Sequence, residues 1–386
     1  MRKLLQLCLC LPLLSALIAN AQDSIAIPRK LTINGYIKDL QTLTFDKDFD
    51  GLTAGNLIHN RINTKWKPSE KVTVVAEFRN RLFWGEEVTR TAGFTSLLRN
   101  GNEAVDMQKI WIENRSMVLI TNVERLYFDY ACNKLSIRIG RQRINWGVNT
   151  SWNPNDIFNG YNFLDFDYEE RSGADAGKIG YLLNNSSNIE FAYAYTGKKE
   201  ASVAALKYAL NKWNYDMQLI AGWYHNRLTA GAGWAGNIKE AGFKGEIQYF
   251  FSGPDSVDHL NLAIEGDYMF KNSWYLNLGM LFNTRGLNRP MDNWSNWNPG
   301  LSPMNLMPTK WSFIVISSKE ITPLLSVNVS VLYSPATNLT VFYPSLRYNI
   351  ATNLDADFLW QSFFAEQRMR FGAINHRAFL RLKWSF

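Results

Sequence analysis

Three arginines on one predicted strand, followed by an acidic stretch, are the residues of this chain best suited to act on other charges. Arg138, Arg141 and Arg143 lie in the segment 135–145, which ends at Trp146-Gly147. The carboxylates that follow are Asp156, Asp165, Asp167, Glu169 and Glu170. Opposed cations and carboxylates select ions by charge. The alternative is that this loop lies outside and that its charges are merely solvated.

Strict alternation along a strand would not place all three arginines on one face. A β-bulge at Gly140 would bring them nearer to one side, because glycine is common at bulges. Arranged in this way, the arginines and the acidic loop resemble the constriction of general porins, where opposed charges set pore size and ion preference.

Residue patterns typical of catalysis or metal binding are missing from the sequence. The four histidines lie in separate segments, at His59, His225, His259 and His376, without a recognisable nucleophile–base motif. None of them, and no cysteine, lies at ligand spacing from another. We therefore expect no enzyme activity, no metal and no cofactor. A hydrolase stays open as a less favoured alternative, because His225 and His376 lie near strand ends where loops could gather residues.

Segments of about ten alternating residues, separated by turns, must position these charges. Between Trp213 and Trp223 the odd-numbered residues are mostly apolar, whereas Asn214, Asp216 and Gln218 lie on the other face. Ten residues span roughly 33 Å, which at the usual tilt projects to about 25 Å of membrane. A soluble sandwich would alternate too, but its core would not carry the charged residues found on the second faces of these strands.

The alternation predicts a transmembrane antiparallel up-and-down β-barrel, because strands in lipid must close on themselves. Strands are expected at 31–39, 56–66, 71–83, 121–131, 135–145, 176–183, 188–196, 201–210, 213–225, 227–237, 241–251, 260–270, 274–284, 309–319, 324–333, 338–348, 353–362 and 377–386. These are 18 strands, and 16 is the alternative because 188–210 is weakly patterned. Such a barrel is wide enough for an aqueous channel. Long external or inward-folded loops are expected at about 84–120, 146–175, 285–308 and 363–376.

The two ends of the chain indicate a compartment. Residues 1–21 combine a basic start, a short apolar run and an A-x-A exit, which is typical of a secretory signal peptide. The mature chain, 22–386, is then a single barrel domain with one cysteine, Cys132, and no internal disulfide. The last strand has Leu380, Leu382 and Trp384 on one face and stops at Phe386, as does the closing strand of bacterial outer-membrane barrels, which it resembles.

That resemblance implies the outer membrane of a Gram-negative bacterium, with lipid and the barrel-assembly machinery as partners, the latter through the strand ending at Phe386. The run GRQRINWG followed by NPNDIF also resembles a stretch of alginate-export and phosphate-selective porin-like barrels. The match covers about 25 residues and implies transport of a polar, anionic solute. The residues carried over are Arg138, Arg141, Arg143, Trp146, Asn153, Pro154 and Asp156.

The charge balance points the same way. The formal net charge is +7, of which Arg2 and Lys3 of the signal peptide contribute two. Strand positions assigned to the lumen include Arg79, Arg81 and Arg125, and a positive lumen concentrates anions. Nucleic-acid binding is not expected, because the basic residues alternate with apolar ones and form no cluster.

The sequence thus predicts a porin for passive or facilitated diffusion of small polar, anionic solutes. Four tryptophans could stack on a solute, namely Trp146, Trp152, Trp294 and Trp297. The alternative function is a structural or adhesive barrel whose lumen is closed by side chains or by the loop around Trp294. Porins of this width are often trimers, but nothing in the sequence decides the oligomeric state.

Overall fold

The computed structural model describes residues 30–99, 103–159, 173–253, 257–291 and 301–386. Its strands are β1 (Leu31–Asp46), β2 (Leu52–Ser69), β3 (Val72–Gly85), β4 (Gln108–Glu113), β5 (Met117–Cys132), β6 (Leu135–Gln142), β7 (Ala174–Asn184), β8 (Ser187–Ala194), β9 (Val203–Lys212), β10 (Tyr215–Tyr224), β11 (Arg227–Ile238), β12 (Ala241–Phe250), β13 (His259–Met269), β14 (Trp274–Asn283), β15 (Trp311–Thr322), β16 (Leu325–Ser334), β17 (Leu339–Ala351), β18 (Leu354–Gln367) and β19 (Arg370–Ser385). Three short helices, α1 (Glu86–Arg90), α2 (Phe94–Leu97) and η3 (Lys199–Ala201), complete the elements of these residues.

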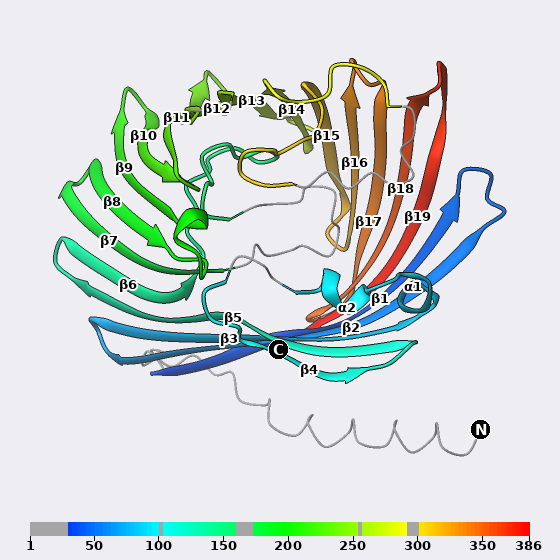
Figure 1. Ribbon diagram of the computed structural model, residues 1–386, viewed down its shortest axis with the longest axis horizontal. Coiled ribbons are helices and arrows are strands. Elements are labelled where there is room, and N and C mark those ends of the chain that lie inside the picture. Colours follow the sequence, from blue (N-terminus) through cyan, green and yellow to red (C-terminus); the bar gives the residue numbers. More distant parts are fainter. Residues whose placement is uncertain (1–29, 100–102, 160–172, 254–256, 292–300) are drawn as a thin grey trace.

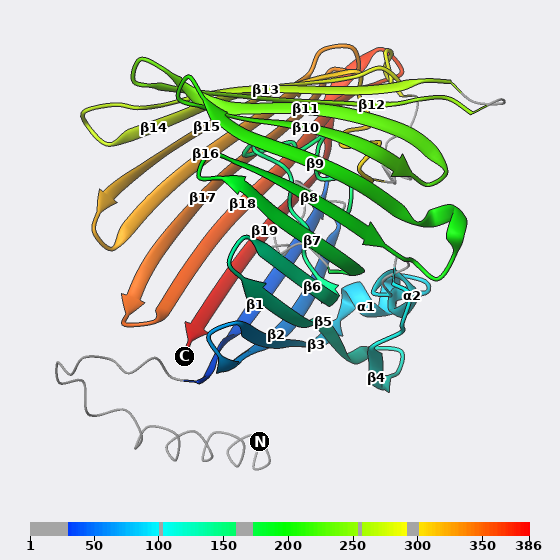
Figure 2. The ribbon, with the colours of Figure 1, turned by 90° about the vertical axis from the view of Figure 1, so that its left-hand side faces the viewer.

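Eighteen of these strands form a closed antiparallel barrel, which confirms the predicted fold class (Figures 1 and 2). Each strand pairs with its neighbour along the chain, and β1 also pairs with β19, so that the sheet has no open edge there. At the seam, Gly35 and Phe386 exchange backbone hydrogen bonds of 3.0 and 2.9 Å. A Cβ on Gly35 would lie 2.1 Å from the Arg61 carbonyl oxygen, so only glycine fits beside the terminal residue.

The connections differ in length between the two ends of the barrel. We call the end that holds the start of β1 and the end of β19 the terminal rim, and the opposite end the loop rim. Turns at the terminal rim are short; at 213–214 both residues have positive φ, 57° and 61°, as a two-residue hairpin turn requires. The longest connections, 86–116, 143–173 and 284–310, all lie at the loop rim.

Two sequence predictions about this rim and one about the number of strands need correction. Residues 363–376 are not a loop: β18 continues to Gln367, β19 begins at Arg370, and the turn between them has two residues. The register shift at Phe363/Phe364 breaks the alternation there, which concealed the strands. The predicted loop 84–120 holds α1, α2 and the extra strand β4, which pairs only with β5 among the described strands. The 16-strand alternative is wrong, because β8 and β9 pair along their length.

The outer face of the barrel is apolar where the alternation predicted it. Trp213, Leu219 and Trp223 of β10 and its turn are 73%, 58% and 59% exposed, while Gln218 is buried on the inner side. Leu380 and Trp384 are likewise exposed on β19. Bands of exposed aromatic and aliphatic side chains are typical of lipid-facing barrel walls. Among the described residues, no helix is long and apolar enough to cross a membrane.

Candidate functional site in the barrel lumen

The connection after β6 turns into the lumen and is held against the wall by two glutamates. Glu246 of β12 accepts three backbone N–H groups from 148–155, with N···O distances of 2.5 to 2.8 Å. Glu265 of β13 accepts two more, from residues 150 and 151, both at 2.7 Å. Both carboxylates are fully buried. Five hydrogen bonds therefore fix the backbone of this segment, which we call the inward loop (143–159).

Two tryptophans attach the inward loop to the wall. Trp146 packs in an apolar cluster with Ile220 and Phe250, and its Nε1 donates to Glu190 Oε2 at 3.0 Å. Trp152 packs in a second cluster around Leu281. Both rings are 2% exposed, so the prediction that they stack on solutes is wrong for this structure. They are anchors instead. Trp294 and Trp297 lie outside the described residues.

Of the five acidic residues in the predicted constriction, one lies among the residues that the structure describes. Asp156 lies within the inward loop and is buried. The remaining acids of that prediction, Asp165, Asp167, Glu169 and Glu170, lie outside the described residues. Their place opposite the arginines therefore stays a prediction.

The three arginines of β6 and its extension do not form a row. Arg138 pairs with Asp129 at 2.7 Å in the terminal-rim half, Arg141 is buried, and Arg143 is exposed beyond the end of β6. The predicted bulge at Gly140 is wrong: the register with β5 and with β7 runs through Gly140 without a shift, although its φ is 120°. Without the bulge, nothing brings the three side chains to one side.

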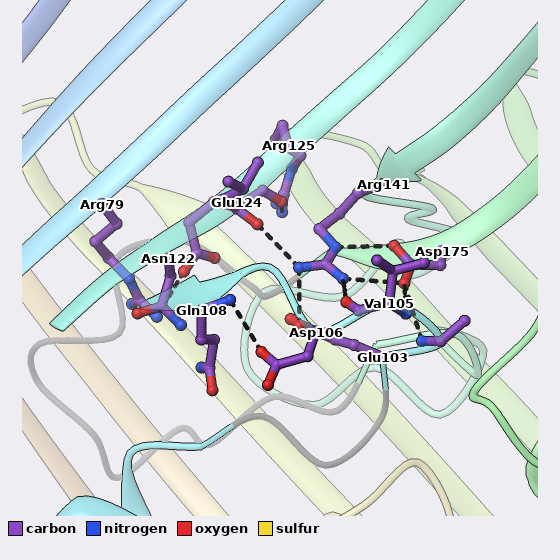
Figure 3. A network of polar contacts seen from close by, with 12 residues as sticks. Arg79, Glu103, Val105, Asp106, Gln108, Asn122, Glu124, Arg125, Arg141 and Asp175 are labelled. Atoms are coloured by element: carbon purple, nitrogen blue, oxygen red, sulfur yellow. Dashed lines mark hydrogen bonds and ion pairs between the residues drawn. The ribbon is translucent and has the colours of Figure 1, made fainter. Parts of the chain in front are cut away.

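Arg141 instead forms a buried network of polar contacts, shown in Figure 3. Its Nε and Nη2 donate to the two oxygens of Asp175 at 2.8 and 2.9 Å, and its Nη1 lies 2.8 Å from Glu103 Oε2. Nη2 also donates to the Val105 carbonyl at 2.6 Å. Asp175 Oδ2 in turn accepts the N–H groups of Ala104 and Val105. We call these five residues the Arg141 node.

The Arg141 node lies where the barrel wall changes partners. β6 ends at Gln142, and beyond that point residues 118–122 of β5 pair with β4 on this side, while β3 still pairs with their other side. The segment 103–107 leads into β4 and lies against the end of β6 and the start of β7, where Arg141 and Asp175 hold it (Figure 3). These contacts take the place of strand pairing at this point of the wall.

A cluster of arginines lies on the neighbouring part of the lumen wall, on β2, β3 and β5, beside the Arg141 node (Figure 3). Its members are Arg61, Arg79, Arg81 and Arg125, which we call the basic wall. A register shift in the β3–β5 pair leaves Glu124 as an extra residue, so Glu124 and Arg125 are both buried on the inner side. Arg79 pairs with Glu124 at 2.7 Å, and all four arginines lie near enough to act on its charge.

Two ion pairs of the basic wall lie among the described residues. Arg61 pairs with Glu77, and Arg79 pairs with Glu124. The predicted lumen positions Arg79, Arg81 and Arg125 therefore lie together, and Arg61 joins them. Their effect on a passing ion stays a prediction.

The four histidines lie apart from one another. One of them, His376, contacts a serine, which the sequence did not reveal. His376 Nδ1 lies 2.8 Å from Ser362 Oγ, a serine–histidine pair on the outer face. The Phe49 ring stacks on the His376 imidazole, with 4.4 Å between the ring centroids. Ser362 and His376 are both buried. The pair is covered by aromatic rings and offers no accessible nucleophile in this conformation.

No protein-family model matches the chain, and a search of curated proteins finds no significant match. Solved structures with similar folds exist. OccAB4 of Acinetobacter baumannii is 11% identical, with a TM-score of 0.59, over 93% of this chain and 99% of that one. The outer membrane protein OprD of Pseudomonas aeruginosa is 8% identical, with a TM-score of 0.58, over 92% and 93%. OccK7 (OpdD) of the same organism is 9% identical, with a TM-score of 0.57, over 92% and 98%. At these identities the likeness shows the fold, a closed 18-strand barrel.

Proposed function

We propose that this protein is an outer-membrane channel for passive diffusion of small polar solutes, with a preference for anions. The basic wall is the observation that carries the proposal. Four arginines gathered on β2, β3 and β5 supply the positive charge on that side of the lumen, and positive charge there concentrates anions and repels cations. A barrel of 18 strands is wide enough to hold an aqueous path between the basic wall and the inward loop.

The outer face and the fold support the membrane setting. Exposed tryptophans and aliphatic side chains on the outer face suit lipid, and the terminal rim would face the periplasm, as in single-chain bacterial barrels. The similar fold of OprD, which is named an outer membrane protein, agrees with this placement. The narrower resemblance to alginate-export and phosphate-selective barrels, the signal peptide and a homotrimer stay predictions.

Planar-bilayer recording of the refolded protein tests the proposal. We expect stable openings and a reversal potential of anion-selective sign under a salt gradient. The double variant Arg81→Gln, Arg125→Gln should reduce that potential. Lys212→Gln is the matched control, because Lys212 lies over the Trp213 ring outside the lumen and the change removes the same kind of charge. A folded barrel without openings would refute the channel, and a cation-selective potential would refute the anion preference.

One observation favours a second candidate, a structural or adhesive barrel with a closed lumen. Lys38 and Arg61 lie on inward-facing positions of β1 and β2, yet they are 0% and 2% exposed. Other protein atoms therefore cover this part of the inner wall, as a closed lumen would require. The same bilayer recording distinguishes the two candidates, because a closed barrel would give no conductance under any salt gradient.

A further inference from the structure

A cavity in the terminal-rim half of the lumen is lined by hydroxyl and amide side chains from four neighbouring strands. Its volume is about 580 Å³, and its lining includes Tyr275 of β14, Ser318 of β15, Asn328 of β16 and Ser345 of β17. Each lies directly opposite the next across its strand pair. Because paired strands lie about 4.8 Å apart, the four side chains form a row roughly 14 Å long. We call it the hydroxyl row.

A second row, two residues nearer the terminal rim, carries charges of both signs. It runs from Glu320 through Ser326 and Arg347 to Asp357, again through directly opposed partners. Asp357 joins Arg347 at 2.8 Å and Arg381 at 2.9 Å. Among the residues that line the cavity, Lys319 and Arg347 balance Glu320 and Asp357 in charge. Recognition in this cavity therefore depends on hydrogen bonds more than on net charge.

The serine hydroxyls of the cavity are available to a ligand. Ser318, Ser326 and Ser345 are half-buried, and the described part of the chain holds no hydrogen-bond partner for their side chains. Farther along the same strands, Ser312 and Ser334 are fully buried and lie 3.2 Å from each other, Oγ to Oγ. Serines near the loop rim thus bond within the protein, whereas those of the cavity face open space.

We infer that this cavity binds a polyhydroxylated solute, a sugar or a polyol. Each serine hydroxyl donates one hydrogen bond and accepts two, and Asn328 adds both functions, which matches the donor and acceptor pattern of adjacent hydroxyls on such a solute. The cavity volume is in the range of small-ligand pockets. The inference rests on the proposed channel function and deepens it by naming the class of solute.

Saturation-transfer NMR with sucrose and the detergent-solubilised full-length protein tests the inference. The triple variant Ser318→Ala, Ser326→Ala, Ser345→Ala removes three hydrogen-bonding groups, so the sucrose affinity should fall about tenfold or more. Ser136→Ala on β6 is the matched control: it removes a half-buried inward hydroxyl in the same half of the barrel, on a different part of the wall. A polyethylene glycol of similar mass is the control ligand, because it would bind equally well if the cavity selected ligands by size alone.

Each result decides the inference, and conductance is judged separately. Binding that is lost in the triple variant and kept in Ser136→Ala supports the hydroxyl row. This binding result supports the hydroxyl row even if the protein shows no conductance in bilayers. In that case the proposed channel function is refuted, and the binding site is not. Equal sucrose affinity in the triple variant and the wild type overturns the inference, as does equal saturation of polyethylene glycol. A conducting channel that gives no sucrose signal overturns the inference alone.

Discussion

Replacing Arg141 by alanine should release the segment 103–107 from the barrel wall without unfolding the barrel. Arg141 is 1% exposed, and its guanidinium contacts Asp175, Glu103 and the Val105 carbonyl. Its removal leaves two largely buried carboxylates without their cation, and breaking a buried ion pair costs about 3–5 kcal/mol. Because each 1.4 kcal/mol is a factor of ten, the open population of this segment should rise at least about 100-fold.

Limited trypsin digestion measures that population. Lys109 lies on β4 directly after the segment and is exposed, but its backbone is paired with β5 until the segment opens. When opening and closing are fast, the cleavage rate follows the open population. We expect faster cleavage after Lys109 in Arg141→Ala, while far-UV circular dichroism shows an intact barrel.

Arg138→Ala is the matched control on the same strand. Arg138 and its partner Asp129 are about a quarter exposed, so their ion pair contributes about 0–1 kcal/mol and cleavage should change less than about fivefold. Equal cleavage of the two variants would refute the reasoning, because it would mean that the Arg141 node does not hold the segment. Asp175→Asn should give an intermediate rate, since the amide oxygen still accepts N–H groups.

Three further predictions concern the inward loop, the outer face and the loop rim. Glu246→Gln with Glu265→Gln weakens the five hydrogen bonds to the inward loop, so single-channel recordings should show larger current fluctuations than the wild type. Leu219→Arg, near the middle of an outward face, should destabilise the barrel by about 2–4 kcal/mol in a urea titration, whereas Trp213→Arg at the turn should cost about 0–1 kcal/mol; equal effects would contradict a lipid-facing wall. Burial lowers the pKa of His225, in the β10–β11 turn, below its ordinary value, so its contribution to stability is complete above about pH 6.5 and declines as the pH falls. In His225→Asn, which suits the positive φ of 47°, thermal unfolding should lose that part of its pH dependence.

The barrel itself was predictable because its outer and inner faces require side chains of different polarity. A residue that faces lipid must be apolar, and one that faces the lumen can be polar, so a period of two appears in the sequence wherever a strand is regular. Trp213 and Trp223 were assigned to one face by this period, and both are exposed on the outside. Where the pairing register shifts, as at Phe363/Phe364, the period breaks and the prediction of a loop was wrong.

The position of the bulge was less predictable, although a signal was present. Glycine at 140 suggested a bulge in β6, but the extra residue lies in the neighbouring strand, at Glu124. Adjacent charges at Glu124 and Arg125 were the better signal, because strict alternation would have put one of them on the lipid face. Nothing local marked the contacts of the inward loop. Glu246 accepts a hydrogen bond from the Val148 N–H, about a hundred residues away in the sequence. Closure of the barrel brings the two groups together.

The sign of the field in the lumen depends on which charges the inward loop covers. Glu246 and Glu265 are buried beneath 148–155, whereas the basic wall lies on other strands. Replacing 148–155 by a short Gly-Ser linker would expose both carboxylates and leave the arginines unchanged. The reversal potential should then move toward cation preference, since exposed carboxylates attract cations into the same water. An unchanged or more anion-selective potential in the replaced channel would show that these glutamates do not act on the path of the ions.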